Sequence, residues 1–205
     1  MENPLFTKYF SRFITYYYKP VEIKLIMASE MDVNPKIFLV DVDGVMTNGQ
    51  FGYTKEGKVM KNFGPDDHDG LSLLKKFVEI KFVTGDKNGL EVTKKRIVDD
   101  MKFPLEIVST VNRIKWISEH YDLKNVIYMG DGIFDHYVFK KVGYSIAPAN
   151  ADKSAKKCAD YITERSGGDR AVAEACLHIL EKFFEPYDPD KLLDSNLKMS
   201  GEWTV

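Results

Sequence analysis

The chain has 205 residues, of which 44% are hydrophobic and 29% are charged. This composition is typical of a water-soluble globular protein with one sizeable core. The formal net charge of −2 gives no basic field of the kind on which nucleic-acid binding depends. The sequence contains no apolar run of about 20 residues and does not begin with a secretory pattern. We therefore expect a cytoplasmic protein with no nucleic acid and no membrane as partner.

The chain divides into three parts by composition. Residues 1–35 form an aromatic-rich extension whose spacing predicts a short amphipathic helix, docked on the body of the protein or on a partner subunit. A membrane-surface helix is the alternative, although its polar face would carry few Lys or Arg residues. Residues 36–184 have the pattern of one domain. Residues 185–205 contain two prolines and predict an extended or partly disordered tail.

Short apolar runs alternate with helical patterns from Lys36 onward. This alternation predicts an α/β fold, a three-layer Rossmann-like parallel sheet wrapped by helices. The expected strands are 36–40, 80–84, 105–109, 125–129 and 143–147, and the expected helices are 70–77, 88–101, 112–120, 133–141 and 168–184. One insertion interrupts the alternation, because residues 50–63 contain two alternating stretches around a glycine-containing turn. They predict a β-hairpin after the first strand.

Two acidic residues, Asp41 and Asp43, follow the first expected strand. Alternate residues of a strand face the same way, and ligands bind at the carboxyl ends of strands in open parallel sheets. Two carboxylates in one crevice repel each other unless a cation compensates, and hard oxygen ligands suit Mg²⁺. An acid at this place can also act only as a turn former or helix cap.

Other strand ends carry polar residues as well. Thr84 and Gly85 follow the second strand, where they offer a hydroxyl donor and a turn. Asp131 follows the fourth strand as a further metal ligand. Asp135 lies four residues later, in the first turn of a helix, where it can orient the site. Together with the acid pair, these residues favour a functional site over isolated turns.

Two further features are open to two interpretations each. Arg113 or Lys115, near the start of helix 112–120, can neutralise phosphate charge, or either can lie on the solvated face of that helix. The Gly167-Gly168 pair can bring backbone close to a ligand, or it can be a plain helix start.

The motifs DVDGVMTNG, VTGD, NRIKWI and YMGDGIFD occur in the order found in the haloacid dehalogenase superfamily. The resemblance covers about residues 36–184. The hairpin and the phrases FGPDDHDGLSLLKKF and SGGDRAVAEACLHIL are similar to the 3-deoxy-manno-octulosonate 8-phosphate phosphatases. They are also similar to the phosphatase-like module of some sialic-acid-activating enzymes. The resemblance implies a Mg²⁺-dependent phosphatase that acts on a small sugar phosphate or sugar-acid phosphate.

The resemblance assigns a role to each matching residue. It implies that Asp41 is the nucleophile that forms an aspartyl-phosphate, and that Asp43 is the general acid and base. Asp131 joins Asp41 and the main-chain carbonyl of Asp43 on Mg²⁺, with Asp135 as an orienting residue. Thr84, Gly85, Arg113 and Lys115 are then the substrate-binding positions, and Thr84 and Arg113 also serve catalysis.

The sequence departs from the family pattern at several cations. Arg113 stands where the superfamily has a lysine, and it keeps the charge but not the compact geometry. Asp86 and Ala173 stand where the subgroup has arginines, with Arg170 shifted nearby, and a third arginine is missing from the segment 63–68. The substrate of this chain therefore need not carry the octulosonate carboxylate.

The intervals between the motifs leave no room for a separate cap domain. In the resembling family the hairpins assemble a tetramer that covers the site, and we expect a homotetramer here. The alternative is a catalytically weakened relative that serves as an oligomerisation or regulatory module, although the intact Asp41, Asp43 and Asp131 argue against it. A phosphoacceptor domain of a two-component regulator is disfavoured, because there the phosphorylated aspartate lies on a middle strand.

Overall fold

The computed structural model describes residues 33–191. Its central sheet has six strands in the order β5-β4-β1-β6-β7-β8, and each neighbouring pair is parallel. The strands are β1 (Ile37–Asp41), β4 (Glu79–Thr84), β5 (Leu105–Ile107), β6 (Val126–Met129), β7 (Tyr144–Ala147) and β8 (Tyr161–Ile162). The chain moves outward in opposite directions on the two sides of β1. The carboxyl end of β1 therefore lies at a switch point of the sheet, where α/β proteins bind ligands.

The first strand is buried along its whole length, as expected of a central strand that is covered on both faces. Its side chains alternate between two cores because successive residues of a strand point to opposite faces. Phe38 and Val40 pack in one hydrophobic cluster, and Ile37 and Leu39 pack in the other. The apolar run of β1 thus holds both helical layers to the sheet.

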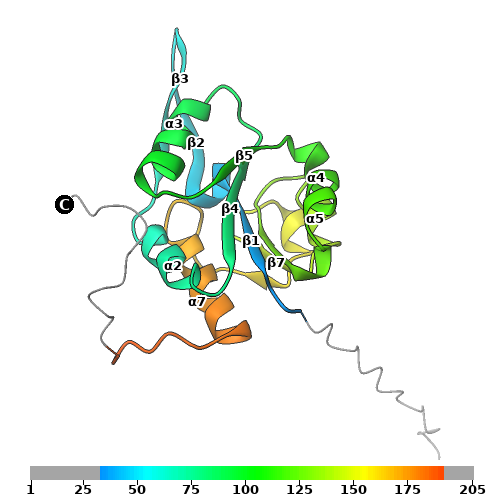
Figure 1. Cartoon of the computed structure of the whole chain (residues 1–205). Coiled ribbons are helices and arrows are strands. Elements are labelled where there is room, and N and C mark those ends of the chain that lie inside the picture. The colour runs from blue at the N-terminus through cyan, green and yellow to red at the C-terminus, as the bar shows by residue number, and fades with distance from the viewer. Residues whose placement is uncertain (1–32, 192–205) are drawn as a thin grey trace, which may run out of the picture. The chain divides into compact units, whose positions relative to one another are not determined.

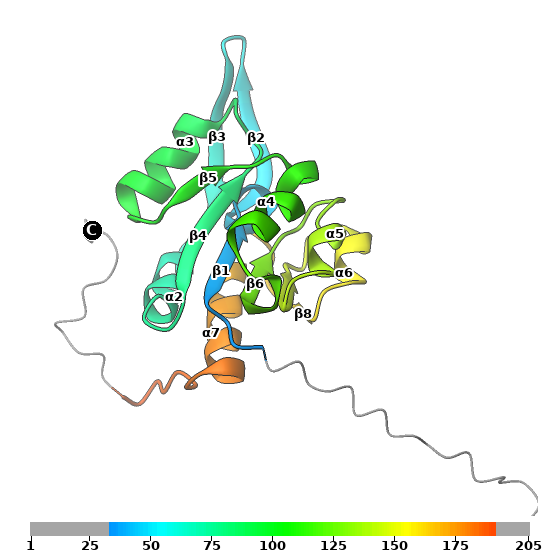
Figure 2. The ribbon, with the colours of Figure 1, turned by 45° about the vertical axis from the view of Figure 1, so that its right-hand side comes forward.

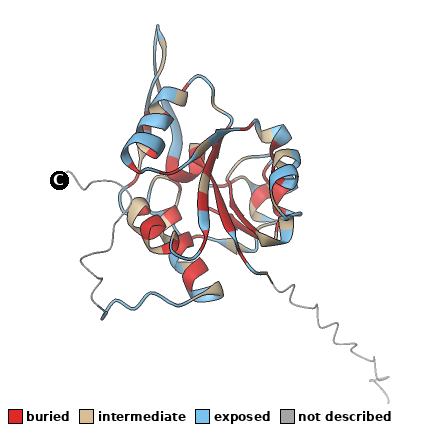
Figure 3. Cartoon of the chain, in the orientation of Figure 1, coloured by how far each residue is buried: buried red, intermediate tan, exposed pale blue. Residues whose placement is uncertain are grey.

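The helices form the two outer layers (Figures 1 and 2). Helices α2 (Asp67–Leu74) and α7 (Ala171–Phe183) contribute to one core, with the segment after α3 (Leu90–Lys94). Helices α4 (Arg113–His120), α5 (His136–Phe139) and α6 (Lys153–Lys156) contribute to the other core. Figure 3 shows the buried sheet between the exposed outer faces of these helices. The three-layer α/β architecture is confirmed.

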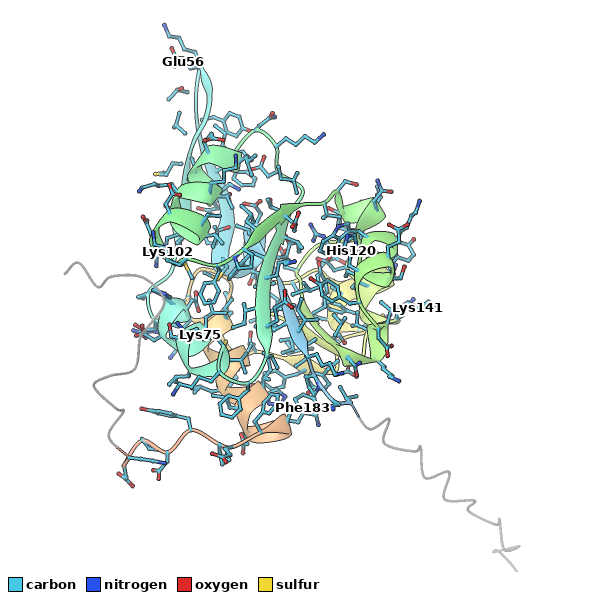
Figure 4. The ribbon with its side chains drawn as sticks, viewed as in Figure 1. Glu56, Lys75, Lys102, His120, Lys141 and Phe183 are labelled. Atoms are coloured by element: carbon cyan, nitrogen blue, oxygen red, sulfur yellow. The ribbon has the colours of Figure 1, made fainter. Side chains whose placement is uncertain are left out.

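The predicted hairpin is also confirmed, as an antiparallel ribbon of β2 (Thr47–Thr54) and β3 (Gly57–Phe63). It forms a sheet of its own and extends away from the central sheet, with Glu56 at its tip (Figure 4). Four of its large apolar side chains are exposed: Phe51, Tyr53, Val59 and Met60.

Several predicted boundaries differ from the structure. Helix α2 begins three residues earlier than expected, at Asp67, directly after the left-handed Asp66. Helix α5 spans only 136–139 instead of 133–141. Its start is later because residues 132–135 form a turn in which the backbone N–H of Gly132 bonds the side chain of Asp135. Helix α6 and strand β8 were not predicted, since such short elements carry no clear periodicity.

The predicted N-terminal helix lies outside the described residues. Of the predicted tail, 185–191 are described and contain no helix or strand. Across residues 33–191 no helix is both long and apolar enough to cross a bilayer.

Candidate active site

The site begins where β1 ends and the turn Val42–Met46 leads toward the hairpin. Asp41 is the last residue of β1, and its Oδ1 accepts a hydrogen bond from Val42 N at 2.8 Å. Gly44 has φ of +88°, and a Cβ at this position would lie 2.0 Å from Asp131 Oδ2. Only glycine fits both the backbone conformation and the contact. The turn after β1 therefore lies directly against the acid that follows β6.

Three carboxylates gather at this place. Asp41, Asp131 and Asp135 can each present an oxygen within 4.8 Å of the others. Burial, followed by repulsion from Asp41 and Asp135, raises the pKa of Asp131 to about 8. The cluster thus concentrates negative charge that a cation would relieve, and its hard oxygen donors suit Mg²⁺.

Arg113 places a buried positive charge beside these acids. Its side chain is 1% exposed, and Nη1 donates to Asp41 Oδ2 at 2.6 Å and to Tyr128 Oη at 2.7 Å. Burial works against the charge of the guanidinium, but Asp41 and the hydroxyl of Tyr128 hold its pKa above the ordinary value. For Asp41, burial raises the pKa to about 6, although Arg113 lowers it. The two groups form one buried ion pair at the base of the site.

Tyr128 and Asp135 extend this network across the sheet. The hydroxyl of Tyr128 donates to Asp135 Oδ1 at 2.7 Å, and Asp135 Oδ2 accepts from Gly132 N at 2.7 Å. Both oxygens of Asp135 are thus hydrogen-bonded, which fixes the orientation of this carboxylate. The sequence predicts Tyr128 only as a residue of the strand 125–129. The feature that could have pointed to its role is a tyrosine inside a buried apolar run, because a buried tyrosine hydroxyl needs a polar partner.

The carboxylate of Asp43 has its partners outside the acid cluster. Thr84 Oγ1 donates to Asp43 Oδ2 at 3.2 Å, and Lys61 Nζ lies 2.7 Å from Asp43 Oδ1. This placement leaves the main-chain carbonyl of Asp43 as the group that the resemblance assigns to the metal.

Lys61 was not predicted as a site residue. It lies on β3, and its side chain is fully buried. Its ammonium also lies 2.8 Å from Thr93 Oγ1 and 2.9 Å from Asp86 Oδ2. In the sequence, Lys61 resembles the other polar residues of an alternating hairpin, so nothing local separates it from a solvent-facing lysine.

A second hairpin lysine, Lys58, reaches the same acid. Its Nζ lies 2.6 Å from Asp86 Oδ2 and 3.4 Å from the centroid of the Phe51 ring. Asp86 Oδ1 accepts from Gly89 N at 3.1 Å. Burial raises the pKa of Asp86, but the bonds from Lys58, Lys61 and Gly89 outweigh it and bring the pKa to about 2. We call Lys58, Lys61 and Asp86 the lysine cluster.

Three other residues singled out from the sequence, Gly85, Lys115 and Arg170, lie outside the acid cluster. Gly85 is exposed beside Thr84 at the end of β4. Lys115 is exposed on the outer side of α4, 3.8 Å from Glu119, and the structure does not bring it to the acids. Arg170 binds Asp66 at 2.5 Å, so this shifted cation is paired with the start of α2.

The Gly167-Gly168 turn packs against the turn after β1. A Cβ on Gly167 would lie 2.0 Å from Gly44 O. Asn150, which was not predicted, joins the two turns, because its Nδ2 donates to Gly44 O at 2.9 Å and its Oδ1 accepts from Gly167 N at 2.6 Å. The glycine pair is therefore more than a helix start, since it supports the backbone next to Asp43.

Comparisons with known proteins agree with this geometry. A family model described as haloacid dehalogenase-like hydrolase matches residues 108–175. The 3-deoxy-D-manno-octulosonate 8-phosphate phosphatases of Salmonella typhi and Escherichia coli K12 are each 31% identical over 169 residues. Each match covers 78% of this chain and 85% of the relative.

A solved structure shares the fold. The Moraxella catarrhalis enzyme of the same name, in complex with magnesium ion, phosphate ion and KDO, gives a TM-score of 0.63 at 25% identity. The match covers 74% of this chain and 89% of that chain. The sequence of the chain, its parallel sheet and the acids that follow its strands all match this family. The chain therefore belongs to the haloacid dehalogenase-like hydrolases, alongside the 3-deoxy-D-manno-octulosonate 8-phosphate phosphatases.

Proposed function

We propose that this protein is a Mg²⁺-dependent phosphatase that hydrolyses a small sugar phosphate or sugar-acid phosphate through an aspartyl-phosphate on Asp41. The observation that carries the proposal is the position of Asp41. It ends the central strand between a buried cation, Arg113, and a group of carboxylates. The relatives named above are phosphatases of a phosphorylated sugar acid, which supports the same reaction class.

Asp41 and Asp43 have different roles in phosphoryl transfer, as nucleophile and as general acid and base. A carboxylate oxygen of Asp41 attacks phosphorus while the bond from phosphorus to the sugar oxygen breaks, and protonated Asp43 gives its proton to that leaving oxygen. Asp43 then takes a proton from water, which attacks phosphorus and breaks the bond to Asp41. The products are the free sugar and inorganic phosphate.

The surrounding residues hold these two carboxylates in place. Arg113 and Val42 N each bind one oxygen of Asp41, while Thr84 and Lys61 contact the two oxygens of Asp43. Fixed partners of this kind reduce the reorganisation that the reaction requires. Arg113 takes the place of the lysine that the family pattern has, and its permanent charge offsets the carboxylates.

The acid cluster fits the metal that the proposal requires. Asp41 and Asp131 would hold Mg²⁺ together with the main-chain carbonyl of Asp43, and Asp135 would orient them. Burial and, after it, repulsion from Asp41 and Asp135 raise the pKa of Asp131. The repulsion supports this assignment, because a bound cation would relieve it. When bound, Mg²⁺ supplies neutralisation of charge on the phosphoryl oxygens.

We also propose that the protein is a homotetramer in which the hairpin contacts another subunit. Tyr53 is 64% exposed, and Val59 and Met60 are each about half exposed. A two-stranded ribbon is at best marginally stable alone, and exposed apolar groups mark interaction sites. A neighbouring subunit would also exclude water from a site that has no cap of its own.

Turnover of p-nitrophenyl phosphate by the purified protein tests the reaction. We expect activity with Mg²⁺, loss of activity in excess chelator, and loss in Asp41→Asn, since an amide is a poor nucleophile and a weaker metal ligand. Asp99→Asn, an exposed position, is the matched control and should behave as wild type. Activity retained in Asp41→Asn would overturn the mechanism. A wild-type protein that is inactive with Mg²⁺ would favour the alternative of a regulatory module.

A further inference from the structure

The lysine cluster lies beside the proposed general acid. The ammonium of Lys61 has three oxygens within 3 Å, from Asp43, Thr93 and Asp86. Thr93 accepts a hydrogen bond from this ammonium, and the two carboxylates hold it in ion pairs. The ammonium of Lys58 also has its partners within the protein. Its side chain is 5% exposed, and Nζ lies between Asp86 and the face of the Phe51 ring.

The cluster is built into the fold. A Cβ on Gly89 would lie 2.3 Å from Asp86 Oδ2 and 2.7 Å from carbons of both lysines. The bare glycine at the start of α3 therefore makes room for the two lysine side chains to cross it. Thr93 lies one turn later and is fully buried. Its Oγ1 accepts a hydrogen bond from Lys61 Nζ and donates one to Gly89 O at 3.2 Å.

Asp86 pairs with both lysines of this group. Lys58 and Lys61 contribute two positive charges and Asp86 one negative charge, and Asp43 adds a second negative charge whenever it does not carry the proton for the leaving group. Both oxygens of Asp86 are occupied, by the two lysines and by Gly89 N. The buried cation next to the acid cluster, Arg113, is bound to Asp41. None of these three cations is left to attract an anionic group on a substrate.

We infer that the substrate carries no charge beyond its phosphate, and that Asp86 is the residue that determines this specificity. The inference rests on the proposed phosphatase function and narrows it to neutral sugar phosphates. Without Asp86, Lys58 would lose its carboxylate partner and Lys61 one of its two. The pair would then present net positive charge next to the leaving group, where it would bind a carboxylate. With Asp86, an acid in the leaving group meets a neutralised surface and loses its own hydration.

Two substrates of similar size test the inference. Glucose 6-phosphate and 6-phosphogluconate are close in size, but the second has a carboxylate and an open chain. Sorbitol 6-phosphate, which is open-chain and has no carboxylate, controls for the missing ring and should behave as glucose 6-phosphate does. We expect wild-type kcat/KM to favour glucose 6-phosphate by about tenfold, which corresponds to one partly screened charge interaction. A preference of the wild type for 6-phosphogluconate would overturn the inference.

Asp86→Asn removes the charge with little change in shape. We expect the ratio of kcat/KM for 6-phosphogluconate to that for glucose 6-phosphate to rise about tenfold, while p-nitrophenyl phosphate turnover reports any general damage to the site. Glu91→Gln makes the same change of charge on α3, at a side chain that is 88% exposed, and should leave the ratio unchanged. An equal change in both variants, or no change in Asp86→Asn, would show that Asp86 does not determine specificity.

A binding measurement separates this inference from the proposed reaction. In the Asp41→Asn background, calorimetry with the two sugar phosphates reports affinity without turnover. We expect weaker binding of 6-phosphogluconate, and a reversal of that order when Asp86→Asn is added. If the wild type proves inactive toward every phosphate ester while this order of affinities holds, the proposed function fails and the charge preference stands. If 6-phosphogluconate binds more tightly with Asp86 in place, the inference fails whatever the activity.

Discussion

Arg113 Nη1 lies 2.6 Å from Asp41 Oδ2, although 72 positions separate the two residues in the chain. The guanidinium also binds Tyr128 Oη and Val108 O. It thereby connects the end of the central strand to β6 and to the segment after β5. Nη1 binds Asp41 and Tyr128 while Nη2 binds Val108 O, and a lysine has no such planar fork of two nitrogens.

Substitutions at Arg113 separate its charge from its geometry. We expect Arg113→Ala to reduce turnover by at least about a hundredfold and to destabilise the protein by about 3 kcal/mol, because Asp41 is left as an uncompensated buried charge. Arg113→Lys should keep or raise turnover, since it restores the cation type of the family. Enzyme assays and urea unfolding of the variants measure both effects. Lys115→Ala, at an exposed lysine of the same helix, is the control; a severe loss there with a silent Arg113→Ala would contradict our placement of this helix.

Metal binding to the acid cluster should appear as thermal stabilisation. Excess Mg²⁺ stabilises the folded state by mass action, by about 2.7 kcal/mol at a hundred times its Kd. We expect Mg²⁺ to raise the Tm of wild type in calorimetry, and to have little effect on Asp131→Asn. Asp169→Asn, at an exposed acid near the start of α7, should respond as wild type does. An undiminished rise in Asp131→Asn would place the metal elsewhere.

Asp67 should make stability depend on pH. It is 1% exposed, and its Oδ1 accepts from Ala173 N at 2.9 Å at the start of α7. Burial raises its pKa to about 6 from 3.8, against the helix N–H groups that lower it. The folded state thus binds the proton more tightly than the unfolded state, so the stabilising contribution of protonated Asp67 is present at low pH. It is lost as pH rises toward and through 6.

The matching variant is Asp67→Asn, which cannot titrate. Between pH 5 and pH 8 we expect wild type to lose about 1 kcal/mol of unfolding free energy relative to this variant, from the size of the pKa shift. Urea denaturation at the two pH values measures it. Asp99→Asn serves as the exposed control. If the difference in unfolding free energy between wild type and Asp67→Asn were the same at both pH values, the prediction would be wrong.

The hairpin should hold the oligomer together. We expect light scattering to show a tetramer at micromolar concentration, and Tyr53→Lys combined with Val59→Lys to shift it toward smaller species with lower turnover. These substitutions place charge on the apolar surface that we assign to the subunit contact. Val98→Lys, at an exposed apolar residue outside the hairpin, controls for the added charge. A wild-type monomer with full activity would refute both the assembly and its role in closing the site.

The sequence alone predicts every strand of the central sheet except the two-residue β8, and the residues that follow β1, β4 and β6. The apolar run of β1 and the alternation of Asp41 with Asp43 are local patterns, and parallel strands bring their carboxyl ends to one edge. Asp41, Asp131 and Asp135 could therefore be predicted to meet. Arg113 and Lys115 remained alternatives, because they lie two positions apart on a helix and face different sides.

Only the tertiary structure decided which of those cations is buried, and which residues support the site. Arg113 lies one turn before the buried Ile117, so it faces the sheet, while Lys115 faces outward. Lys61 meets Thr93 across 32 positions, and Asn150 meets Gly44 across 106. Such contacts leave no periodic signal in the chain, because they depend on how the hairpin and the loops pack. The charge balance around Asp86 exists only after the hairpin has folded against α3, where buried ammonium groups must find oxygen partners because water no longer reaches them.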